Sequence, residues 1–293
     1  MTKLCVVIPT YNEAENLPKL TMQIEKVLRK RNFNLIVVDD NSPDNTAKVA
    51  QKLNQVYGNI IVRIQARKYG LGSAILEGLK IALAMKDVER IVTLDGDLSH
   101  DPSEIPKLLY VAQKTDFVQG SRYVEDGAVM GWGLRRRLIS YAANMICKLL
   151  FRISIRDCTG NFRVYSRACA ETIVKSAGSK GFEWVVEALF VAKKHGFGVK
   201  EVPITFMERK EGKTKLKALQ VVGWALFTVK NLFSLKPLAV NVPVQSSRAI
   251  HRSSAFTVTV VPPMTSTTTY TLSSRSLGWS DQAELIYSVK SSE

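Results

Sequence analysis

The segment Ile91-Val92-Thr93-Leu94-Asp95-Gly96-Asp97 is a short apolar run that ends in two acidic residues. Leu4 to Ile8 runs in the same way into Pro9-Thr10-Tyr11-Asn12-Glu13, and Leu35 to Val38 ends at Asp39-Asp40. Short apolar runs bounded by polar residues are typical of strands buried on both faces of a parallel sheet. Ligands of open α/β sheets bind at the carboxyl ends of the strands, so we expect these acidic groups in one crevice. Because carboxylates gathered without a cation repel one another, the pattern predicts a divalent metal ion there.

Helical periodicity alternates with strand-like runs over most of the chain before residue 213. This alternation predicts a parallel sheet with right-handed crossovers and flanking helices. Further strands are expected at 60–64, 117–120 and 199–204, and a turn that feeds a short strand is expected over 157–165. Helices are expected over 17–28, 49–57, 75–83, from about residue 103, over 130–151 and over 183–194.

Composition limits the function classes. The 293 residues, 46% of them hydrophobic, suffice for one sizeable α/β domain and additional material. A formal net charge of +15 indicates an anionic partner, which is nucleic acid, a phosphorylated ligand or an acidic membrane surface, unless the basic surface is inert. No secretory signal is expected, because Pro9 interrupts the first apolar run. The four cysteines are Cys5, Cys147, Cys158 and Cys169, and no pair has metal-ligand or redox-motif spacing. This predicts reduced thiols in a cytosol-facing protein, with catalysis or disulfides as the alternatives.

The character of the chain changes near residue 213. Lys213, Lys215 and Lys217 precede the apolar stretch 218–229, which is shorter than the ~20 residues of a membrane-spanning helix. The stretch predicts a basic, amphipathic helix at a membrane surface, with an ordinary helix packed on the domain as the alternative. We therefore expect three regions: an α/β domain at 1–212, this helix at 213–236, and a poorly ordered Ser/Thr-rich tail at 237–293. Within the tail, 255–261 has the composition of a strand without an identified partner.

The acidic segment that ends the fourth strand carries the chemistry. Residues two apart on a strand point to the same side, so Asp95 and Asp97 can reach one metal ion and a diphosphate bound to it, although such triplets also cap turns. His100 is expected in a supporting loop, since Mg²⁺ and Mn²⁺ prefer oxygen ligands. Asp39-Asp40 at the end of the second strand is ambiguous alone, since an acidic residue at that place is a common ribose or base contact. Glycine-rich phosphate loops are missing from the sequence, so metal and basic side chains would hold the diphosphate.

Six further motifs combine with these features. They are 38–46, 70–74, 95–100, 120–123, 161–165 and 209–215. Together they resemble the family 2 glycosyltransferases of the GT-A fold, and within that family the polyprenyl-phosphate sugar synthases, nearest to the dolichol-phosphate mannosyltransferases. The resemblance covers roughly Lys3 to Leu235. It implies an open, mostly parallel sheet that binds a nucleotide sugar, flanked by helices.

The resemblance also implies a role for each motif residue. Asp95 and Asp97 would hold Mg²⁺ or Mn²⁺ against the diphosphate with the Gly96 backbone close by, and Asp97 and Arg122 would be the catalytic pair. Arg122, Arg209 and Lys215 would contact phosphates of the donor or acceptor. Ser99 departs from the glutamine that the family often has there, so water would complete the metal shell. The guanosine pocket of GDP-mannose would comprise Pro9, Tyr11, Glu13, Val38 and Asp40.

The implied reaction explains why the sequence shows no persuasive general base. The implied acceptor is dolichyl or another polyprenyl phosphate, and a phosphate monoester has a second pKa of about 6. Such a phosphate is already ionised at neutral pH and attacks the sugar without first losing a proton. We therefore expect one displacement with inversion at the anomeric carbon.

Several interpretations remain open at this stage. Arg135-Arg136-Arg137 forms either a solvated face or a contact with lipid headgroups or the acceptor phosphate. Glu183 is either a helix-start carboxylate or a neighbour of the acceptor. Tryptophans 132, 184 and 224 are expected to pack or to anchor at an interface rather than to stack on sugar.

The expected location is the cytoplasmic face of a membrane, with direct lipid contact or a membrane-anchoring partner protein. Another donor such as UDP-glucose is the close alternative to GDP-mannose. A nucleic-acid-binding module is disfavoured, because no aromatic-basic RNA signature or DNA-reading helix is visible. A phospho-accepting receiver domain fits neither the length of the chain nor the paired Asp95 and Asp97.

Overall fold

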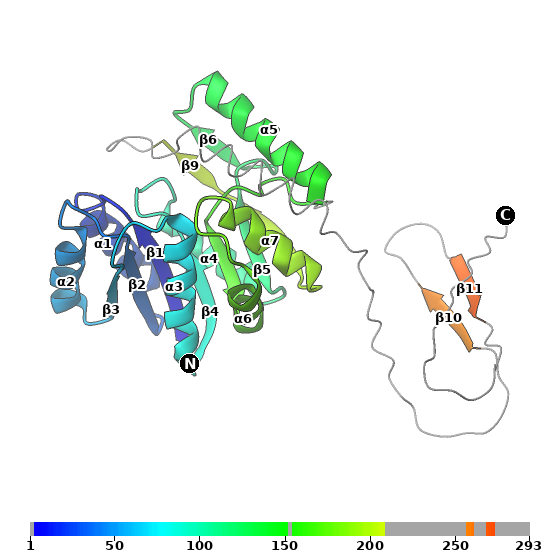
Figure 1. Cartoon of the computed structure of the whole chain (residues 1–293), viewed down its shortest axis with the longest axis horizontal. Coiled ribbons are helices and arrows are strands. Elements are labelled where there is room, and N and C mark those ends of the chain that lie inside the picture. Colours follow the sequence, from blue (N-terminus) through cyan, green and yellow to red (C-terminus); the bar gives the residue numbers. More distant parts are fainter. Residues whose placement is uncertain (1–2, 152–153, 209–255, 261–267, 273–293) are drawn as a thin grey trace. The chain divides into compact units, whose positions relative to one another are not determined.

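The computed structural model describes residues 3–151, 154–208, 256–260 and 268–272 (Figure 1). The chain forms two compact units, Met1–Leu238 and Ala239–Glu293. The second unit contains an antiparallel pair, β10 (Phe256–Val260) and β11 (Thr268–Leu272), so the strand expected near 255–261 has a partner. The expected helix at 213–236 lies outside the described residues, as does the rest of the tail.

The first unit is built on a seven-stranded sheet with the order β3-β2-β1-β4-β7-β5-β8. All neighbouring strands are parallel except where β7 pairs with β4 and β5. A separate parallel pair joins β6 (Ala128–Met130) to β9 (Thr205–Met207). The seven strands are β1 (Lys3–Thr10), β2 (Phe33–Asp39), β3 (Ile60–Ile64), β4 (Val88–Thr93), β5 (Phe117–Ser121), β7 (Arg163–Ser166) and β8 (Val199–Pro203).

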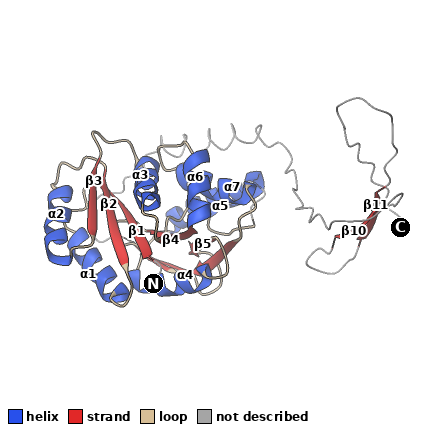
Figure 2. Ribbon diagram, turned by 90° about the horizontal axis from the view of Figure 1, so that it is seen from below, coloured by secondary structure: helices blue, strands red, loops and turns tan. Residues whose placement is uncertain are grey.

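Helices cover both faces of this sheet (Figure 2). Cys5 and Val7 of β1 face one buried cluster with α3, α6 and α7, and the alternate residues Leu4, Val6 and Ile8 face a second cluster with α1 and α4. This two-sided burial explains why the strands are continuously apolar. The helices of the first unit are α1 (Leu17–Leu28), α2 (Thr46–Tyr57), α3 (Leu71–Ala84), the 3₁₀ turn η1 (Pro102–Glu104), α4 (Ile105–Ala112), α5 (Leu134–Phe151), α6 (Arg167–Ser176) and α7 (Trp184–Lys194).

The mostly parallel α/β fold is confirmed, and several details differ from what the strand–helix alternation predicts, among them α6, a helix that was not expected. The sheet is not wholly parallel, because β7 runs against its neighbours, and a hydrophobic pattern carries no information on strand direction. The helix expected over 130–151 begins at Leu134, since Met130 still belongs to β6. The partner of β6, β9, was not expected at all, because three residues are too few for a recognisable period.

The cysteines behave as buried apolar groups. All four are buried and none forms a disulfide, as the sequence predicts. Burial raises the pKa of the Cys5 and Cys169 thiols to about 12. Because thiolate is the reactive form, both side chains are inert core residues at neutral pH.

Two glycines place the start of α3 against α7. Gly70 has a φ of +110°, a backbone conformation that side chains other than glycine rarely adopt. A Cβ on Gly72 would lie 2.4 Å from the Cβ of Trp184, so only glycine permits this close approach. The contact positions the first turn of α3 beside the carboxyl ends of β1 and β4, where the cavity described next is found.

Candidate active site

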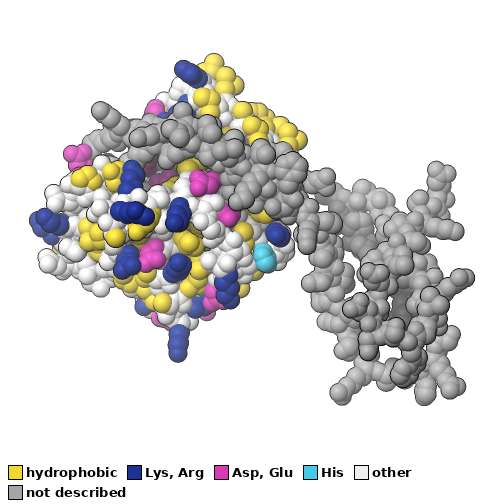
Figure 3. All heavy atoms as spheres, viewed as in Figure 1, with side chains coloured by type: hydrophobic (Ala, Val, Ile, Leu, Met, Phe, Trp, Pro, Cys, Tyr) yellow, Lys and Arg dark blue, Asp and Glu magenta, His cyan; other side chains and the backbone are white. Residues whose placement is uncertain are grey.

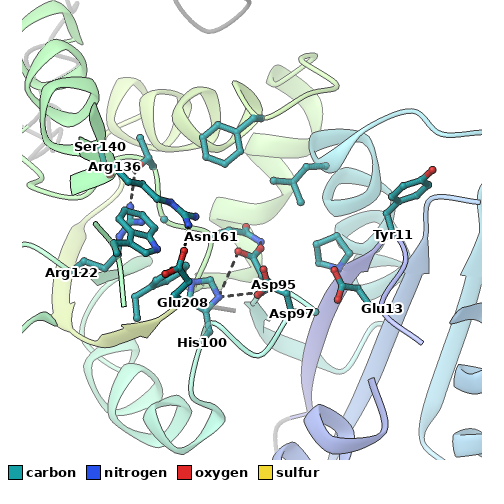
Figure 4. Close-up of a pocket in the computed structure, with 18 of the residues that line it drawn as sticks. Tyr11, Glu13, Asp95, Asp97, His100, Arg122, Arg136, Ser140, Asn161 and Glu208 are labelled. Carbon is teal, nitrogen blue, oxygen red and sulfur yellow. Dashed lines mark hydrogen bonds and ion pairs between the residues drawn. The ribbon is translucent and has the colours of Figure 1, made fainter. Parts of the chain in front are cut away.

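A cavity of about 780 Å³ lies at the carboxyl ends of β1 and β4, where the strand order of the sheet changes direction. This is the expected ligand position in an open α/β sheet. In Figure 4, Tyr11 and Glu13 lie on one side, Arg122 and Arg136 on the other, and Asp95 and Asp97 between them. The lining residues are Pro9, Thr10, Tyr11, Glu13, Asp40, Lys68, Gly70, Leu71, Ala74, Asp95, Gly96, Asp97, His100, Arg122, Trp132, Gly133, Arg135, Arg136, Ile139, Ser140, Ala143, Thr159, Gly160, Asn161, Phe182, Phe206 and Glu208.

The side of the cavity near β1 and β2 brings together four of the five residues expected around guanosine. They are Pro9, Tyr11, Glu13 and Asp40. The fifth, Val38, has a fully buried side chain in the core and does not line the cavity. We call the four residues the nucleotide side of the cavity.

Asp40 and its neighbour Asp39 have different roles. The Asp40 carboxylate accepts hydrogen bonds from the backbone N–H groups of Tyr69 (2.7 Å) and Gly70 (2.8 Å), which fixes the loop that precedes α3. Asp39 instead accepts from the Ser42 N–H (2.9 Å) and the Thr10 hydroxyl (3.1 Å), and it does not line the cavity. The expectation that every strand-end carboxylate faces one crevice is therefore wrong for Asp39, because successive side chains point to opposite sides.

The Tyr11 ring provides a flat face on the nucleotide side. The Lys68 Nζ lies 3.3 Å from the centroid of this ring, close enough for a cation–π contact. Both residues line the cavity. An aromatic face beside a lysine suits a planar base attached to a phosphorylated sugar.

The centre of the cavity holds the acidic pair. The Asp95 side chain is 31% exposed, and its Oδ1 accepts a hydrogen bond from Asn161 Nδ2 at 2.9 Å. Asp97 is 5% exposed, and its Oδ1 accepts from the Ser99 N–H at 3.1 Å. A Cβ on Gly96 would lie 3.2 Å from Thr10 Cγ2, so the segment packs tightly against the end of β1. These contacts hold the two carboxylates in fixed positions.

His100 holds the backbone of the segment that carries Asp95 and Asp97. Its Nδ1 accepts a hydrogen bond from the Asp95 N–H at 3.1 Å, and its ring packs against Phe162 and Phe206. Burial lowers the pKa of His100, and this effect outweighs the opposite influence of Asp95 and Asp97. His100 is thus a neutral supporting residue, in agreement with the interpretation from sequence.

The donor set of the acidic pair fits Mg²⁺ or Mn²⁺. Among the described residues, no three His, Cys, Asp or Glu side chains gather as a complete metal site. Mg²⁺ is commonly held by only one or two carboxylates, with substrate phosphates and water completing its shell. Asp95 and Asp97 together match that requirement, because both line a cavity large enough for a nucleotide.

Opposite the nucleotide side, Arg122 forms a buried ion pair with Asp157. The Arg122 Nε and Nη2 donate to the two Asp157 oxygens at 2.7 Å each, and Nη2 also donates to the Thr159 hydroxyl at 2.8 Å. Burial opposes ionisation of both groups, but each partner outweighs it: the pKa of Asp157 is lowered and that of Arg122 is raised. Among the described residues, none accepts a hydrogen bond from Nη1. Arg122 therefore lines the cavity as a charged group with one nitrogen left for a ligand.

The Arg135-Arg136-Arg137 triplet divides between two tasks. Arg135 and Arg136 line the cavity, and Arg136 Nη1 pairs with Glu208 Oε1 at 2.9 Å. Arg137 donates to the Val129 carbonyl at 2.8 Å and so ties α5 to β6. Two residues assigned to phosphate contacts, Arg209 and Lys215, lie outside the described residues.

Four residues of this site were not identified from sequence. Asn161 and Asp157 precede β7, and Glu208 follows β9. Trp132, expected to pack or to anchor at an interface, lines the cavity with its ring near Arg122 and Arg136. The motif 161–165 contained the signal for Asn161, but no pattern linked it to Asp95. Glu183, the proposed neighbour of the acceptor, does not line the cavity; its carboxylate accepts from the Gly181 N–H at 3.0 Å.

Two curated proteins with similar sequences are named as enzymes of polyprenol- or dolichol-phosphate mannose. The chain is 37% identical over 219 residues to a polyprenol monophosphomannose synthase of Mycolicibacterium smegmatis. The aligned residues cover 74% of this chain and 82% of that protein. It is 38% identical over 218 residues to a dolichol-phosphate mannosyltransferase of Pyrococcus furiosus, which covers 73% of this chain but 59% of that protein. The chain thus spans about three fifths of the length of the Pyrococcus relative.

Solved structures share the fold at low sequence identity. Mannosyl-3-phosphoglycerate synthase of Rubrobacter xylanophilus superposes with a TM-score of 0.58 at 18% identity, over 92% of this chain and 86% of that one. Glucosyl-3-phosphoglycerate synthase of Mycobacterium tuberculosis, solved with Mn²⁺, UDP-glucose and phosphoglyceric acid, gives 0.57 at 16% identity over 80% and 79%. The model of the family named Glycosyl transferase family 2 matches residues 5–174. Together with the relatives, this match shows that the chain belongs to glycosyltransferase family 2.

Proposed function

We propose that the protein transfers mannose from GDP-mannose to a polyprenyl phosphate such as dolichyl phosphate, with Mg²⁺ or Mn²⁺ at Asp95 and Asp97. The observation that carries the proposal is the order of groups across one cavity: a nucleotide side, two carboxylates, then two arginines. This is the order in which a nucleotide, its metal-bound diphosphate and an anionic acceptor would lie. The names of the two curated relatives support the sugar and the acceptor class.

The donor would occupy the nucleotide side and the centre. Pro9, Tyr11, Glu13 and Asp40 would contact the guanosine, with Val38 supporting them from the core. Asp95 and Asp97 would hold the cation beside the diphosphate, with the Gly96 backbone packed closely behind. When bound, the cation neutralises the charge that develops on the departing nucleoside diphosphate.

The acceptor phosphate would meet the arginines. Arginine presents a planar fork that matches phosphate oxygens, and each charge-assisted hydrogen bond contributes roughly 1.5–3 kcal/mol. Arg122 keeps its charge because Asp157 stabilises it, and among the described residues its Nη1 has no acceptor. Arg209 and Lys215 would add further phosphate contacts. Since the phosphate is already ionised, alignment and charge stabilisation suffice for a single displacement with inversion.

We also propose that α5 brings the site to the cytoplasmic face of a membrane. Large apolar side chains stand exposed along this helix, including Leu138 (59%) and Leu149 (70%), and they gather at the top of the view in Figure 3. Arg135 and Lys148 supply positive charge on the same helix, which suits anionic lipid headgroups. In the part of the chain that the structure describes, none of the helices combines the length and hydropathy needed to cross a bilayer.

The test is transfer of radiolabelled mannose from GDP-mannose to dolichyl phosphate in the presence of Mn²⁺ or Mg²⁺. We expect label in the organic extract, release of GDP, and an axial-to-equatorial change at the anomeric carbon by NMR. UDP-glucose in excess should not compete for the site. Transfer of glucose in preference to mannose would show that UDP-glucose, not GDP-mannose, is the donor. Product formed without any divalent cation would show that the reaction needs no metal ion.

A further inference from the structure

Glu208 lies in the wall of the cavity and forms an ion pair with Arg136. The two side chains are 41% and 38% exposed, and both line the cavity. The Glu208 N–H donates to the Met130 carbonyl at 2.9 Å, which fixes the backbone directly after β9. A Cβ on Gly131 would lie 2.8 Å from the Cβ of Glu208, so the glycine makes room for this position.

Trp132 gathers the two arginines of the cavity around one ring. The guanidinium carbon of Arg136 lies 4.1 Å from the centroid of a Trp132 ring, and that of Arg122 lies 5.4 Å away. Trp132 itself is 9% exposed. Two cations held near one indole repel each other, so each needs an anion nearby.

The two arginines have very different anionic partners. Asp157 is fully buried, binds Arg122 through both oxygens and accepts a further bond from the Arg122 N–H at 3.0 Å. Glu208 binds Arg136 through one oxygen and is exposed to solvent. Exposed single-contact pairs are weak, whereas a buried pair that loses one partner leaves an unpaired charge behind. A ligand can therefore displace Glu208 but not Asp157.

We propose that the Glu208 carboxylate stands in for the acceptor phosphate on Arg136, and that the phosphate displaces it on binding. This inference rests on the proposed function for the identity of the acceptor. A phosphate monoester is nearly dianionic at neutral pH and offers Arg136 two oxygens, so it outcompetes a carboxylate bound through one. Glu208 therefore weakens acceptor binding and keeps Arg136 in place while the site awaits its acceptor.

The test compares two ion pairs that match in length and exposure. Glu208→Gln removes the carboxylate from Arg136, and Glu171→Gln removes the one that lies 2.9 Å from Arg167 Nε on α6 and is 42% exposed. None of the residues that line the cavity comes from α6. Binding of farnesyl phosphate and of GDP with Mn²⁺ to the full chain is measured by calorimetry for both variants and the wild type.

We expect Glu208→Gln to tighten farnesyl phosphate binding by about 2- to 10-fold, the range for loss of an exposed competing pair. The affinity for GDP with Mn²⁺ stays within about 2-fold, because the nucleotide side is unchanged. Glu171→Gln changes neither affinity. In an Arg136→Gln background, Glu208→Gln no longer increases the affinity for farnesyl phosphate, because the guanidinium for which the carboxylate and the phosphate compete is gone.

Unchanged or weaker farnesyl phosphate binding by Glu208→Gln overturns the inference. Equal tightening of farnesyl phosphate binding in the Arg136→Gln background also overturns it. A fall in kcat of Glu208→Gln at saturating acceptor overturns it as well, because it would show that Glu208 contacts the substrate during the reaction. The mannose-transfer assay separates the two proposals. Transfer by the wild type without tightening in Glu208→Gln rejects this inference alone, and tightening without any transfer supports it while rejecting the proposed donor and acceptor pair.

Discussion

The two sides of the cavity manage charge in opposite ways. On the nucleotide side and at the centre, carboxylates are held by neutral donors: Asp40 by two backbone N–H groups, Asp95 by the amide of Asn161. On the other side, Arg122 and Arg136 are each held by a carboxylate. Asp40 and Asp95 thus keep negative charge that a cation can neutralise, whereas Arg122 and Arg136 already have a carboxylate partner. On the proposed function, the first side would bind a metal ion together with the diphosphate, and on the further inference the second side would exchange one anion for another.

The largest effect is expected from loss of a charge at the centre. Asp97→Asn keeps the size of the side chain and the acceptor for the Ser99 N–H but removes the negative charge, so we expect mannose transfer to fall about 10³-fold or more. Mn²⁺ binding, followed by electron paramagnetic resonance, should weaken in parallel. Asp101→Asn in the same loop is the control, because its side chain accepts from Ser103 outside the cavity. Full activity of Asp97→Asn would show that transfer does not depend on a metal ion held by Asp97.

The buried pair on the basic side should dominate stability. Asp157→Asn leaves Arg122 buried beside a neutral group, so we expect a loss of about 3 to 5 kcal/mol in the free energy of unfolding at pH 7, measured with urea. The control Glu171→Gln, in an exposed pair, should change it by less than about 0.5 kcal/mol. Equal losses in both variants would show that burial does not distinguish the two pairs.

The same pair gives the wild type a defined pH dependence. The folded pKa of Asp157 is lowered, so its contribution is fully present above its unfolded pKa of about 3.9 and is lost as the pH falls through the folded value. We expect the difference between wild type and Asp157→Asn to be constant above about pH 5 and to shrink in more acidic buffer. A difference that grows on acidification would contradict the direction of the shift.

A smaller effect is expected from the amide that holds Asp95. Asn161→Ala removes a 2.9 Å hydrogen bond to a proposed metal ligand, and loss of such support costs about 10- to 100-fold in metal affinity. Asn59→Ala is matched to it, since Asn59 Nδ2 donates to Glu25 Oε1 at 2.9 Å away from the cavity. Mn²⁺ titration should show weaker binding by Asn161→Ala than by Asn59→Ala. Equal Mn²⁺ affinities would show that metal binding does not depend on the hydrogen bond from Asn161 to Asp95.

The smallest effect concerns the exposed leucines of α5, Leu138 and Leu149, which do not line the cavity. Leu138→Ser with Leu149→Ser should weaken binding to anionic vesicles by about 10-fold, because partly buried leucines contribute on the order of 1 kcal/mol each to transfer from water. Val56→Ser with Tyr110→Ser removes side chains of comparable exposure, 75% and 67%, from α2 and α4. Cosedimentation with anionic vesicles measures the binding of both double variants. Equal losses of binding would show that the exposed leucines of α5 are not the membrane contact.

The sequence predicts the nucleotide side well and the basic side poorly, for a physical reason. Asp40 directly follows β2, and Asp95 and Asp97 come shortly after the end of β4 at Thr93, so local pattern and strand direction place them. Asn161 reaches Asp95 across 66 residues, Asp157 reaches Arg122 across 35, and Glu208 reaches Arg136 across 72. Pairings of that kind depend on how β7, β6 and β9 are arranged, and no local period reveals such an arrangement. Even on the nucleotide side, the choice between Asp39 and Asp40 depended on which side chain faces the cavity.

The reversed direction of β7 has a consequence for how such enzymes diversify. In a parallel sheet, only segments that leave a strand reach the ligand-binding edge. Because β7 runs the other way, the segment that enters it, from Asp157 to Asn161, reaches that edge and supplies both the anchor of Arg122 and the amide on Asp95. One inverted strand thus gives the binding edge an incoming loop as well as outgoing ones. Changes in that loop would act on the proposed metal site and the proposed acceptor site together, while the strand order of the sheet stays as it is.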